Sequence, residues 1–186
     1  MKKEIVLPFS KTKRIRLNAG FFKKMFPAAK TPLKVNLTDS LIALLGGFLS
    51  IGLLSYLTQF TNTLWIMAPF GASCVLAFGI WNAPFSQPRN IVGGHLLSTF
   101  IGICIYTLFG NTPWALALAV GLAIFGMMIT KTTHPPAGAD PIVVIAGGYS
   151  WNYLFSPVLI GSMIIVIAAL LVNNLQKDRK YPTFWL

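Results

Sequence analysis

The chain has 186 residues, of which 55% are hydrophobic and only 10% are charged. About a quarter of the residues of a soluble domain are charged, so this composition excludes an ordinary soluble domain and indicates an integral membrane protein. The net charge of +11 is concentrated at the two ends, because ten of the fifteen Lys and Arg residues lie in the first 34 residues and three more lie near the C-terminus. Basic flanks around an almost uncharged middle are typical of a protein with cytoplasmic ends and membrane spans, and we expect no nucleic-acid partner.

The basic N-terminal segment, residues 1–38, mixes its cations with apolar side chains between residues 11 and 26. That mixture is typical of a short helix lying on an anionic membrane surface. A basic tail without regular structure is the alternative. On the first interpretation the partners of this segment are the lipid bilayer and its anionic lipids.

Six apolar segments follow, each near the ~20 helical residues that a hydrocarbon core ~30 Å thick requires. Asp39 or Ser40 is the predicted N-cap of the first segment. Pro, Gly and other small residues interrupt the second and the fifth. In chain order the segments cover residues 40–57, 63–81, 91–109, 113–130, 135–149 and 153–175.

The charges between these segments test whether all six cross the membrane. With six crossings and a cytoplasmic N-terminus, the loops that hold Arg89 and Lys131 and the basic C-terminal tail all face the cytoplasm, as the positive-inside rule prefers. With four crossings and two re-entrant segments, those two residues face outside. We therefore predict a multi-pass protein of a bacterial inner membrane with both termini cytoplasmic.

The second and fifth segments share a short motif. Residues 69–73 are Pro-Phe-Gly-Ala-Ser, and residues 136–140 are Pro-Ala-Gly-Ala-Asp. The predicted fold is an all-α polytopic membrane protein made of two inverted three-segment repeats, residues 39–110 and 111–176, with a short tail at 177–186. Inverted repeats with broken helices are typical of transporters and channels. Chance similarity, or packing kinks without a ligand, are the alternatives.

Residues 131–141 are the stretch that we expect to do the chemistry. They include one of the two histidines of the chain and three prolines, which forbid an ordinary straight helix. Irregular backbone at membrane depth is tolerated only where it is buried in protein or lines a wet cavity. The N–H groups at the starts of two half-helices would bind an anion there, and Gly71 and Gly138 would permit close backbone approach.

Asp140 is the acid in this stretch, and an acid inside a membrane is functional by default. It would cap its half-helix, take up a proton coupled to transport, or pair with Lys131 or Arg89. His134 would relay protons or donate to an entering anion, or else fix its loop. The residues expected to bind substrate or line a pore are Pro69, Gly71, Ala72, Ser73, Arg89, Asn90, His95, Lys131, His134, Pro135, Pro136, Gly138, Ala139 and Asp140.

The sequence offers little support for a metal site or for covalent catalysis. Cys74 and Cys104 lie in apolar segments and are expected to be small core residues. No spacing typical of a metal site or a disulfide framework is present. Because no nucleophile–base pair or phosphate loop stands out, we expect neither an enzyme nor a cofactor.

Two blocks carry a family resemblance that covers about residues 35–175. Thr133-His134-Pro135-Pro136-Ala137-Gly138-Ala139 resembles the signature of the HPP family of integral membrane proteins, and residues 68–73 with 87–95 resemble its other landmark. The resemblance implies a multi-span protein, in a family with members linked to nitrite transport. The family is often described with four spans, which differs from the six predicted here.

The sequence therefore predicts a membrane transporter or channel for a small inorganic monoanion, with nitrite as the first candidate. The ion would meet Arg89, His95, Lys131 and His134 on the cytoplasmic side and then pass the half-helix ends. A pore for small neutral solutes, and a non-transporting scaffold or regulatory subunit, are the alternatives. Several glycines would also allow close contacts between protomers of a homo-oligomer.

Overall fold

The helical part of the structure begins at Asn36, which is the N-cap of its first helix. The structure is a computed structural model that describes residues 25–26, 31 and 36–185. The chain divides into Met1–Val35 and Asn36–Leu186, and the description below concerns the second unit. The N-terminal interfacial helix expected between residues 11 and 26 lies, apart from its last two residues, outside the described residues.

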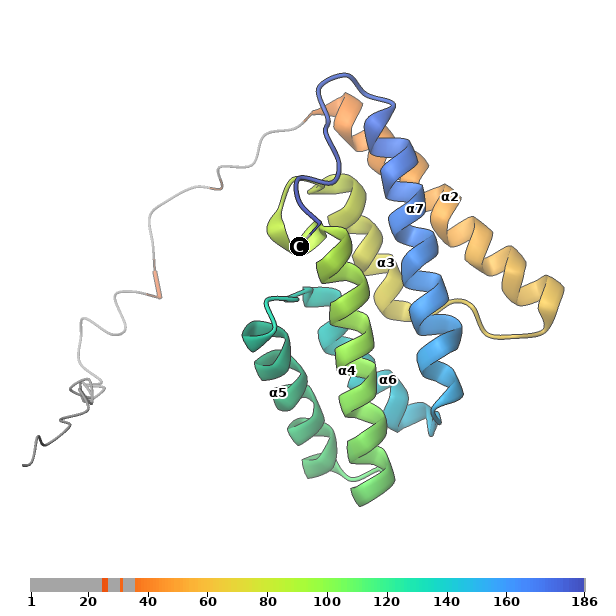
Figure 1. Cartoon of the computed structure of the whole chain (residues 1–186), viewed down its shortest axis with the longest axis vertical. Helices are drawn as coiled ribbons and strands as arrows, with labels where there is room; N and C mark the ends of the chain where they lie inside the picture. Colours follow the sequence, from red (N-terminus) through yellow and green to blue (C-terminus); the bar gives the residue numbers. More distant parts are fainter. Residues whose placement is uncertain (1–24, 27–30, 32–35, 186) are drawn as a thin grey trace, which may run out of the picture. The chain divides into compact units, whose positions relative to one another are not determined.

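Within the described residues the secondary structure is helical, as the sequence predicts. Six α-helices are present: α2 (Leu37–Thr61), α3 (Ala68–Cys74), α4 (Pro88–Phe109), α5 (Pro113–Ile129), α6 (Asp140–Gly147) and α7 (Ile160–Asn174) (Figure 1). Shorter π- or 3₁₀-helical turns join them: η1 (Val75–Gly79), η2 (Pro84–Ser86), η3 (Pro135–Ala139) and η4 (Leu154–Leu159).

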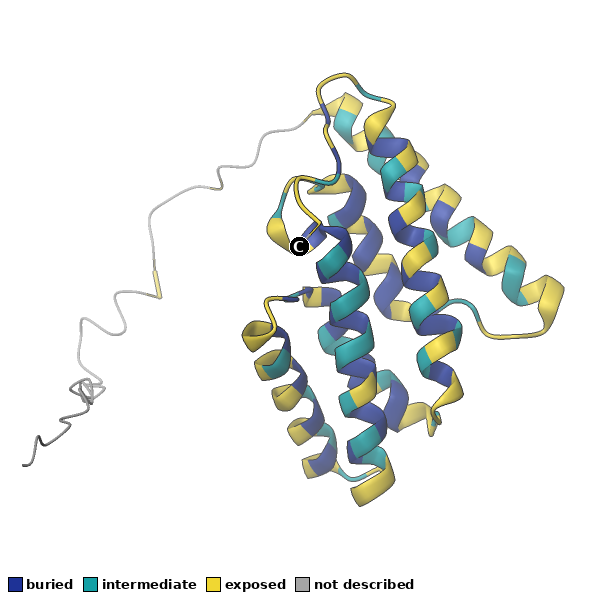
Figure 2. Ribbon diagram, in the orientation of Figure 1, coloured by how far each residue is buried: buried dark blue, intermediate teal, exposed yellow. Residues whose placement is uncertain are grey.

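Three of the described helical stretches are long and apolar enough to cross a membrane. They are Leu37–Thr61, Pro88–Phe109 and Leu154–Asn174, while Ala68–Gly79 and Pro113–Ile129 are shorter apolar helices. In Figure 2 the exposed residues of these helices lie on their outer sides and the buried residues face one another. Many of the exposed residues are large and apolar, such as Leu44, Phe48 and Leu171. Such an apolar outer surface is suited to lipid.

The predicted start of the first helix was wrong by one turn. Asn36 is the N-cap, and its side-chain oxygen accepts a hydrogen bond from the backbone N–H of Asp39 at 3.2 Å. A cap of this kind contributes about 1 kcal/mol. The carboxylate of Asp39 is instead bound by Arg179, at 2.6 Å from Nη2, so it joins the start of α2 to the C-terminal tail.

The fifth segment is broken at its motif, but the break in the second segment lies before its motif: residues 69–73 are helical in α3, because a proline is tolerated in the first turn of a helix. The chain from Asn62 to Met67 is not helical, and α3 begins only at Ala68, with a proline in its first turn. The fifth segment starts with the 3₁₀ turn η3 and continues as α6. In Figure 1, α3 and α6 both start near the middle of the bundle and run from there in opposite directions.

Glycines of α4, rather than those of the motifs, allow the close approach of these segments. A Cβ on Gly94 would lie 2.7 Å from the Cβ of His134, and one on Gly102 would lie 2.9 Å from the Cα of Pro141. The expectation for Gly71 and Gly138 was wrong, because a Cβ on either would meet nothing within 4 Å. Gly94 and Gly102 therefore let η3 and α6 pack directly on α4.

The C-terminal tail folds back over one end of the bundle. Arg179, only 5% exposed, donates to Asn173 Oδ1 at 2.7 Å and to the carbonyl of Phe78 at 3.0 Å. Further along, the Tyr181 hydroxyl donates to the carbonyl of Ser86 at 2.8 Å. Burial raises the pKa of the Tyr181 phenol above its ordinary value. The tail thus holds the connection between η1 and α4.

Candidate functional site

Four polar side chains meet in the interior of the bundle, each from a different element. Ser73 comes from α3, His95 from α4, His134 from the residue before η3, and Asp140 from the first position of α6. All four are completely buried, with 0% of each exposed. These four residues are called the buried cluster below. The sequence predicted each as a site residue without predicting that they touch.

Ser73 is the centre of the buried cluster. Its Oγ lies 2.7 Å from Nε2 of His95 and 2.8 Å from Nε2 of His134. The Oγ also lies 3.2 Å from the carbonyl oxygen of Pro69, one turn earlier in α3. A serine of the first motif therefore connects both histidines, and it joins the two interrupted segments directly.

The second nitrogen of each imidazole is also bonded. His134 Nδ1 lies 2.7 Å from the carbonyl oxygen of Phe85. A carbonyl can only accept, so Nδ1 of His134 carries a hydrogen. His95 Nδ1 lies 2.7 Å from Oδ2 of Asp140, and Thr99 donates to the same oxygen at 3.4 Å. A continuous chain of hydrogen bonds thus runs from Asp140 to Phe85.

Asp140 is paired, but not with the partners that the sequence suggested. Its partner is His95, whereas the interpretation from sequence offered Lys131 or Arg89. Nor does its side chain cap α6, because no side-chain cap bond is present at that helix start. Its other oxygen, Oδ1, is buried without a hydrogen-bond partner. A carboxyl at 0% exposure with one bonded oxygen is costly in an apolar interior.

Aromatic and apolar groups close the site. The ring of Phe70 packs edge-on against the imidazole of His95 with centroids 5.3 Å apart, and the two imidazoles lie 4.9 Å apart at 71°. The half-helix starts therefore do not open onto a wet passage in this state. The polar side chains between these helix starts are present, but the surrounding groups close them off from solvent.

Of the four residues predicted to meet the ion on the cytoplasmic side, only Arg89 and Lys131 lie near the surface. Arg89 donates from Nη2 to the carbonyl of Thr130 at 3.0 Å, at the end of α5, and Lys131 is exposed beside it with a left-handed φ of 58°. The two histidines do not line this surface, because they are buried. Asn90 fixes the second motif by donating to the carbonyl of Thr133 at 2.9 Å, while its Oδ1 has no partner.

The remaining predicted residues surround the cluster rather than join it. Ala72, Pro135 and Pro136 line an apolar hollow of about 390 Å³ on the outside of the two motifs. Pro69 is buried, Gly71 is exposed, and Gly138 and Ala139 are partly exposed in the turn before α6. We infer that these small residues and prolines shape the backbone of the motifs and make no polar contact at the cluster.

Sequence reasoning missed three groups that hold the site in place. Thr99 binds Asp140, and its position four residues after His95 on one helix face was a signal that could have identified it. Gln87 is completely buried and bonds the carbonyls of Trp81 and Ala83 and the N–H of Thr183. The sequence interpretation used Arg179 only as one of the positive charges of the C-terminal tail, although in the structure it is a buried residue with a structural role.

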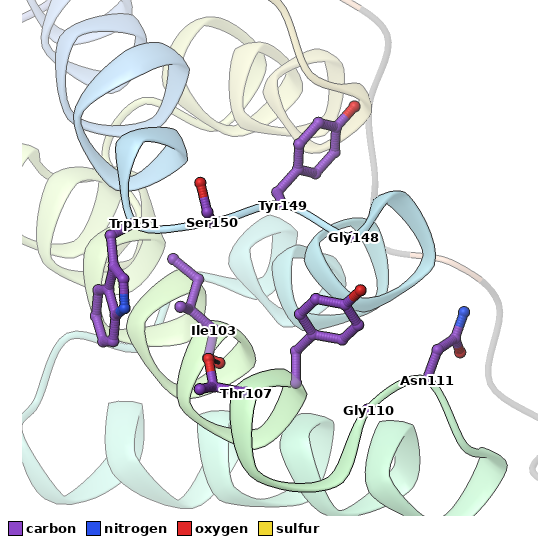
Figure 3. A pocket seen from close by; sticks show the side chains of 9 residues that line it. Ile103, Thr107, Gly110, Asn111, Gly148, Tyr149, Ser150 and Trp151 are labelled. Carbon is purple, nitrogen blue, oxygen red and sulfur yellow. Dashed lines mark hydrogen bonds between the residues drawn. The ribbon is translucent and has the colours of Figure 1, made fainter.

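A cavity of about 450 Å³ lies at the other end of α4, where α4 and α6 end. It sits between the loops at residues 110–112 and 148–151, which carry no charge, and its lining includes hydroxyl, amide and aromatic side chains (Figure 3). The lining residues are Ile103, Tyr106, Thr107, Gly110, Asn111, Gly148, Tyr149, Ser150 and Trp151. It is the polar hollow nearest to the predicted outer loops.

Imidazole and carboxyl groups are common acid–base groups in proteins, so the chemistry available to the cluster is the exchange of protons. Ser73, His95 and Asp140 also have the connectivity of a serine–histidine–aspartate triad, which the sequence did not reveal. Within the described residues no group of three His, Cys, Asp or Glu side chains is arranged to hold a metal ion.

Comparisons with known proteins agree with the membrane architecture. The family model for the HPP transmembrane region matches residues 32–182. Two transmembrane proteins of Dictyostelium discoideum are similar, one 40% identical over 89% of this chain and 57% of its own length, the other 38% identical over 64% and 45%. The chain thus spans about half the length of these relatives. No solved structure matches. Because the family model matches residues 32–182, most of the chain, the chain belongs to the HPP family of integral membrane proteins.

Proposed function

We propose that this HPP-family chain is a transporter or channel for a small inorganic monoanion, with nitrite as the first candidate substrate. The observation that carries the proposal is the buried cluster, in which both interrupted segments meet through Ser73. Polar side chains inside a membrane protein are costly and mark substrate or ion pathways. The helices around the cluster expose apolar surface suited to lipid.

The contacts of the C-terminal tail support six crossings. Arg179 donates to Asp39 at the start of α2 and to the carbonyl of Phe78 at the end of the second segment, and Tyr181 donates to the carbonyl of Ser86 just before α4. Six alternating crossings place these points on one side, which we assign to the cytoplasm, whereas a re-entrant second segment would place Phe78 and Ser86 on the side opposite the start of α2. The bacterial inner membrane stays a prediction, since the relatives named above come from a eukaryote.

The proposed path has three parts. It begins at the cavity between the uncharged loops near Asn111 and Ser150, passes the buried cluster and ends beside Arg89 and Lys131. When the cluster opens, the hydroxyl of Ser73 and the N–H groups of the imidazoles become donors for an anion. Such donors stabilise a monoanion without burying a formal countercharge.

A flux assay tests this proposal. The full chain is reconstituted in liposomes, and uptake of nitrite, nitrate, formate and chloride is measured against empty liposomes. We expect saturable nitrite uptake, lost in His134→Gln and kept in Asp178→Asn, since Asp178 is exposed in the tail. No uptake of any anion would contradict the proposal. Swelling with neutral solutes that persists in Arg89→Gln would favour the neutral pore, and a stoichiometric co-purifying protein would favour a scaffold.

A serine hydrolase is the second candidate, favoured by the 2.7 Å contacts of His95 with Ser73 and with Asp140. Two features weigh against it. Ser73 is 0% exposed, and its Oγ is also held by a second imidazole, so a carbonyl carbon has no approach to it. Labelling with a fluorophosphonate probe tests this candidate: covalent modification of Ser73 would support hydrolysis, and its absence would count against it.

A further inference from the structure

We propose that the closed buried cluster holds one proton more than an ionised aspartate and two neutral histidines would hold, and that this proton latches the two interrupted segments together. The inference rests on the proposed function, since what the latch closes is the proposed anion path. It follows from counting hydrogens along contacts of 2.7 to 2.8 Å, because each such contact needs one hydrogen between its two atoms.

The count begins at His134. Its Nδ1 hydrogen goes to the carbonyl of Phe85, so a neutral His134 presents a lone pair at Nε2. The single hydrogen of the Ser73 hydroxyl fills that contact. The contact between Ser73 and His95 then needs a hydrogen on Nε2 of His95.

The last contact now lacks a hydrogen. With Nε2 protonated, a neutral His95 has a lone pair at Nδ1, which faces Oδ2 of Asp140 at 2.7 Å. The hydrogen between them makes Asp140 a neutral acid or His95 an imidazolium. Both descriptions contain the same number of protons, and in both the cluster has no net charge.

Moving the extra proton elsewhere does not remove the need for it. If His134 is the imidazolium, its Nε2–H donates to Ser73, Ser73 donates to His95, and His95 donates from Nδ1 to the carboxylate of Asp140. If the Ser73 hydrogen turns to the carbonyl of Pro69, 3.2 Å away, both Nε2 atoms must donate and still another proton is needed. Every arrangement that fills the contacts therefore holds at least one extra proton.

Loss of that proton leaves three hydrogens for four contacts, and the contact that breaks is at Ser73, because the ionised carboxylate of Asp140 holds the hydrogen of His95 most strongly. The remaining hydrogens give His95 an Nδ1–H bonded to the carboxylate, and lone pairs at Nε2 of both imidazoles. One hydroxyl hydrogen cannot serve both nitrogens, so Ser73 separates from His95 on α4 or from His134 of the second motif. The cluster then also carries a negative charge in an apolar interior, which adds to the cost of staying closed.

Few other ionisable groups lie where they could supply or accept the extra proton. Tyr153, at the start of the sixth segment, directs its hydroxyl to Met67 Sδ and not to the cluster. Arg89 of α4 is turned to Thr130, and Arg179 is paired with Asp39 outside the cluster. The proton that leaves the cluster goes to water on the side that opens.

The two histidines make the inference directly measurable, because the chain has no others. We would record ¹⁵N solid-state NMR spectra of the full chain in lipid bilayers with ¹⁵N-labelled histidine, between pH 5 and the upper limit of folding. His134→Gln, which leaves one histidine, assigns the signals. In the closed state at acid pH we expect His134 protonated at Nδ1 and at least one of the two Nε2 atoms protonated. An unprotonated Nε2 on both histidines there would overturn the hydrogen count.

Asp140→Asn tests the latch itself. An amide N–H can donate to Nδ1 of His95 without being released as a proton, so this variant mimics the proton-loaded state at every pH. Hydrogen–deuterium exchange of residues 68–79, corrected for the intrinsic pH dependence, should rise about tenfold or more with pH in the wild type. It should stay low in Asp140→Asn, and Asp178→Asn should follow the wild type. Identical pH dependence in the wild type and Asp140→Asn would overturn the latch.

The same variants separate this inference from the proposed function. Anion uptake should increase with pH in the wild type and stay low in Asp140→Asn. If the wild type transports no anion, the proposed function fails while the NMR and exchange results still decide the latch. If it transports anions but uptake and exchange are insensitive to proton release, the latch fails and transport stands.

Discussion

Ser73→Ala is the most informative perturbation of stability, since one oxygen atom joins three elements. Its removal leaves Nε2 of His95 and Nε2 of His134 without partners, although both are completely buried. A buried polar group left unpaired costs about 1–3 kcal/mol, so two such groups predict a loss of about 2–6 kcal/mol. The change in side-chain volume is small and adds little to this cost.

Ser50→Ala provides the matched control. Ser50 is 1% exposed, and its hydroxyl donates to the carbonyl of Gly46 within α2 at 2.8 Å. That carbonyl keeps its helical partner when the hydroxyl is removed, so the expected loss is below about 1 kcal/mol.

The assay is denaturant-induced unfolding of the purified chain in mild detergent micelles, followed by tryptophan fluorescence and circular dichroism. The free energy of unfolding is compared among the wild type, Ser73→Ala and Ser50→Ala. Equal losses in the two variants, or a loss below about 0.5 kcal/mol in Ser73→Ala, would refute the central position that we assign to Ser73.

Two further predictions concern the packing around the cluster. Gly94→Ala places a Cβ against the segment that holds His134, and overpacking of this kind costs about 1–3 kcal/mol of folding free energy. The control Gly121→Ala should not destabilise the fold, because a Cβ there would meet nothing within 4 Å. Equal thermal stability of the two variants would contradict the close packing at Gly94. Because burial raises the pKa of the Tyr181 phenol, the folded state keeps a proton that the unfolded chain releases, so the free energy of unfolding should be unaffected below about pH 10 and should fall above it. The fall should be smaller in Tyr181→Phe, and an identical fall would show that the tail does not bury this phenol.

The latch also explains why the cluster is uncharged overall. A buried ion pair recovers its desolvation cost only when every partner is bonded, and Asp140 Oδ1 lacks a partner. A shared proton between Asp140 and His95 avoids a net charge at this depth. The neutral closed state and the charged opened state differ by one proton, which gives the site a direct response to pH.

The sequence by itself determined the class of protein and the presence of two interrupted segments, and it placed the four cluster residues among fourteen candidate site residues. Composition and charge distribution are enough to identify a membrane protein, because a lipid-facing helix must be apolar along its whole length. Proline and glycine at fixed positions are enough to indicate the interrupted segments, because they act on local backbone geometry. The family signature around His134 could also be recognised from the sequence alone.

Only the tertiary structure decided which polar atoms meet. Ser73, His95, His134 and Asp140 are up to 67 residues apart, and their contacts depend on how closely α3 and the second motif pack on α4. That distance is set by Gly94 and Gly102, whose neighbours are not adjacent in sequence. Periodicity places a residue on a helix face but cannot say which atom of another helix lies opposite it, and hydrogen-bond chemistry is decided at that scale.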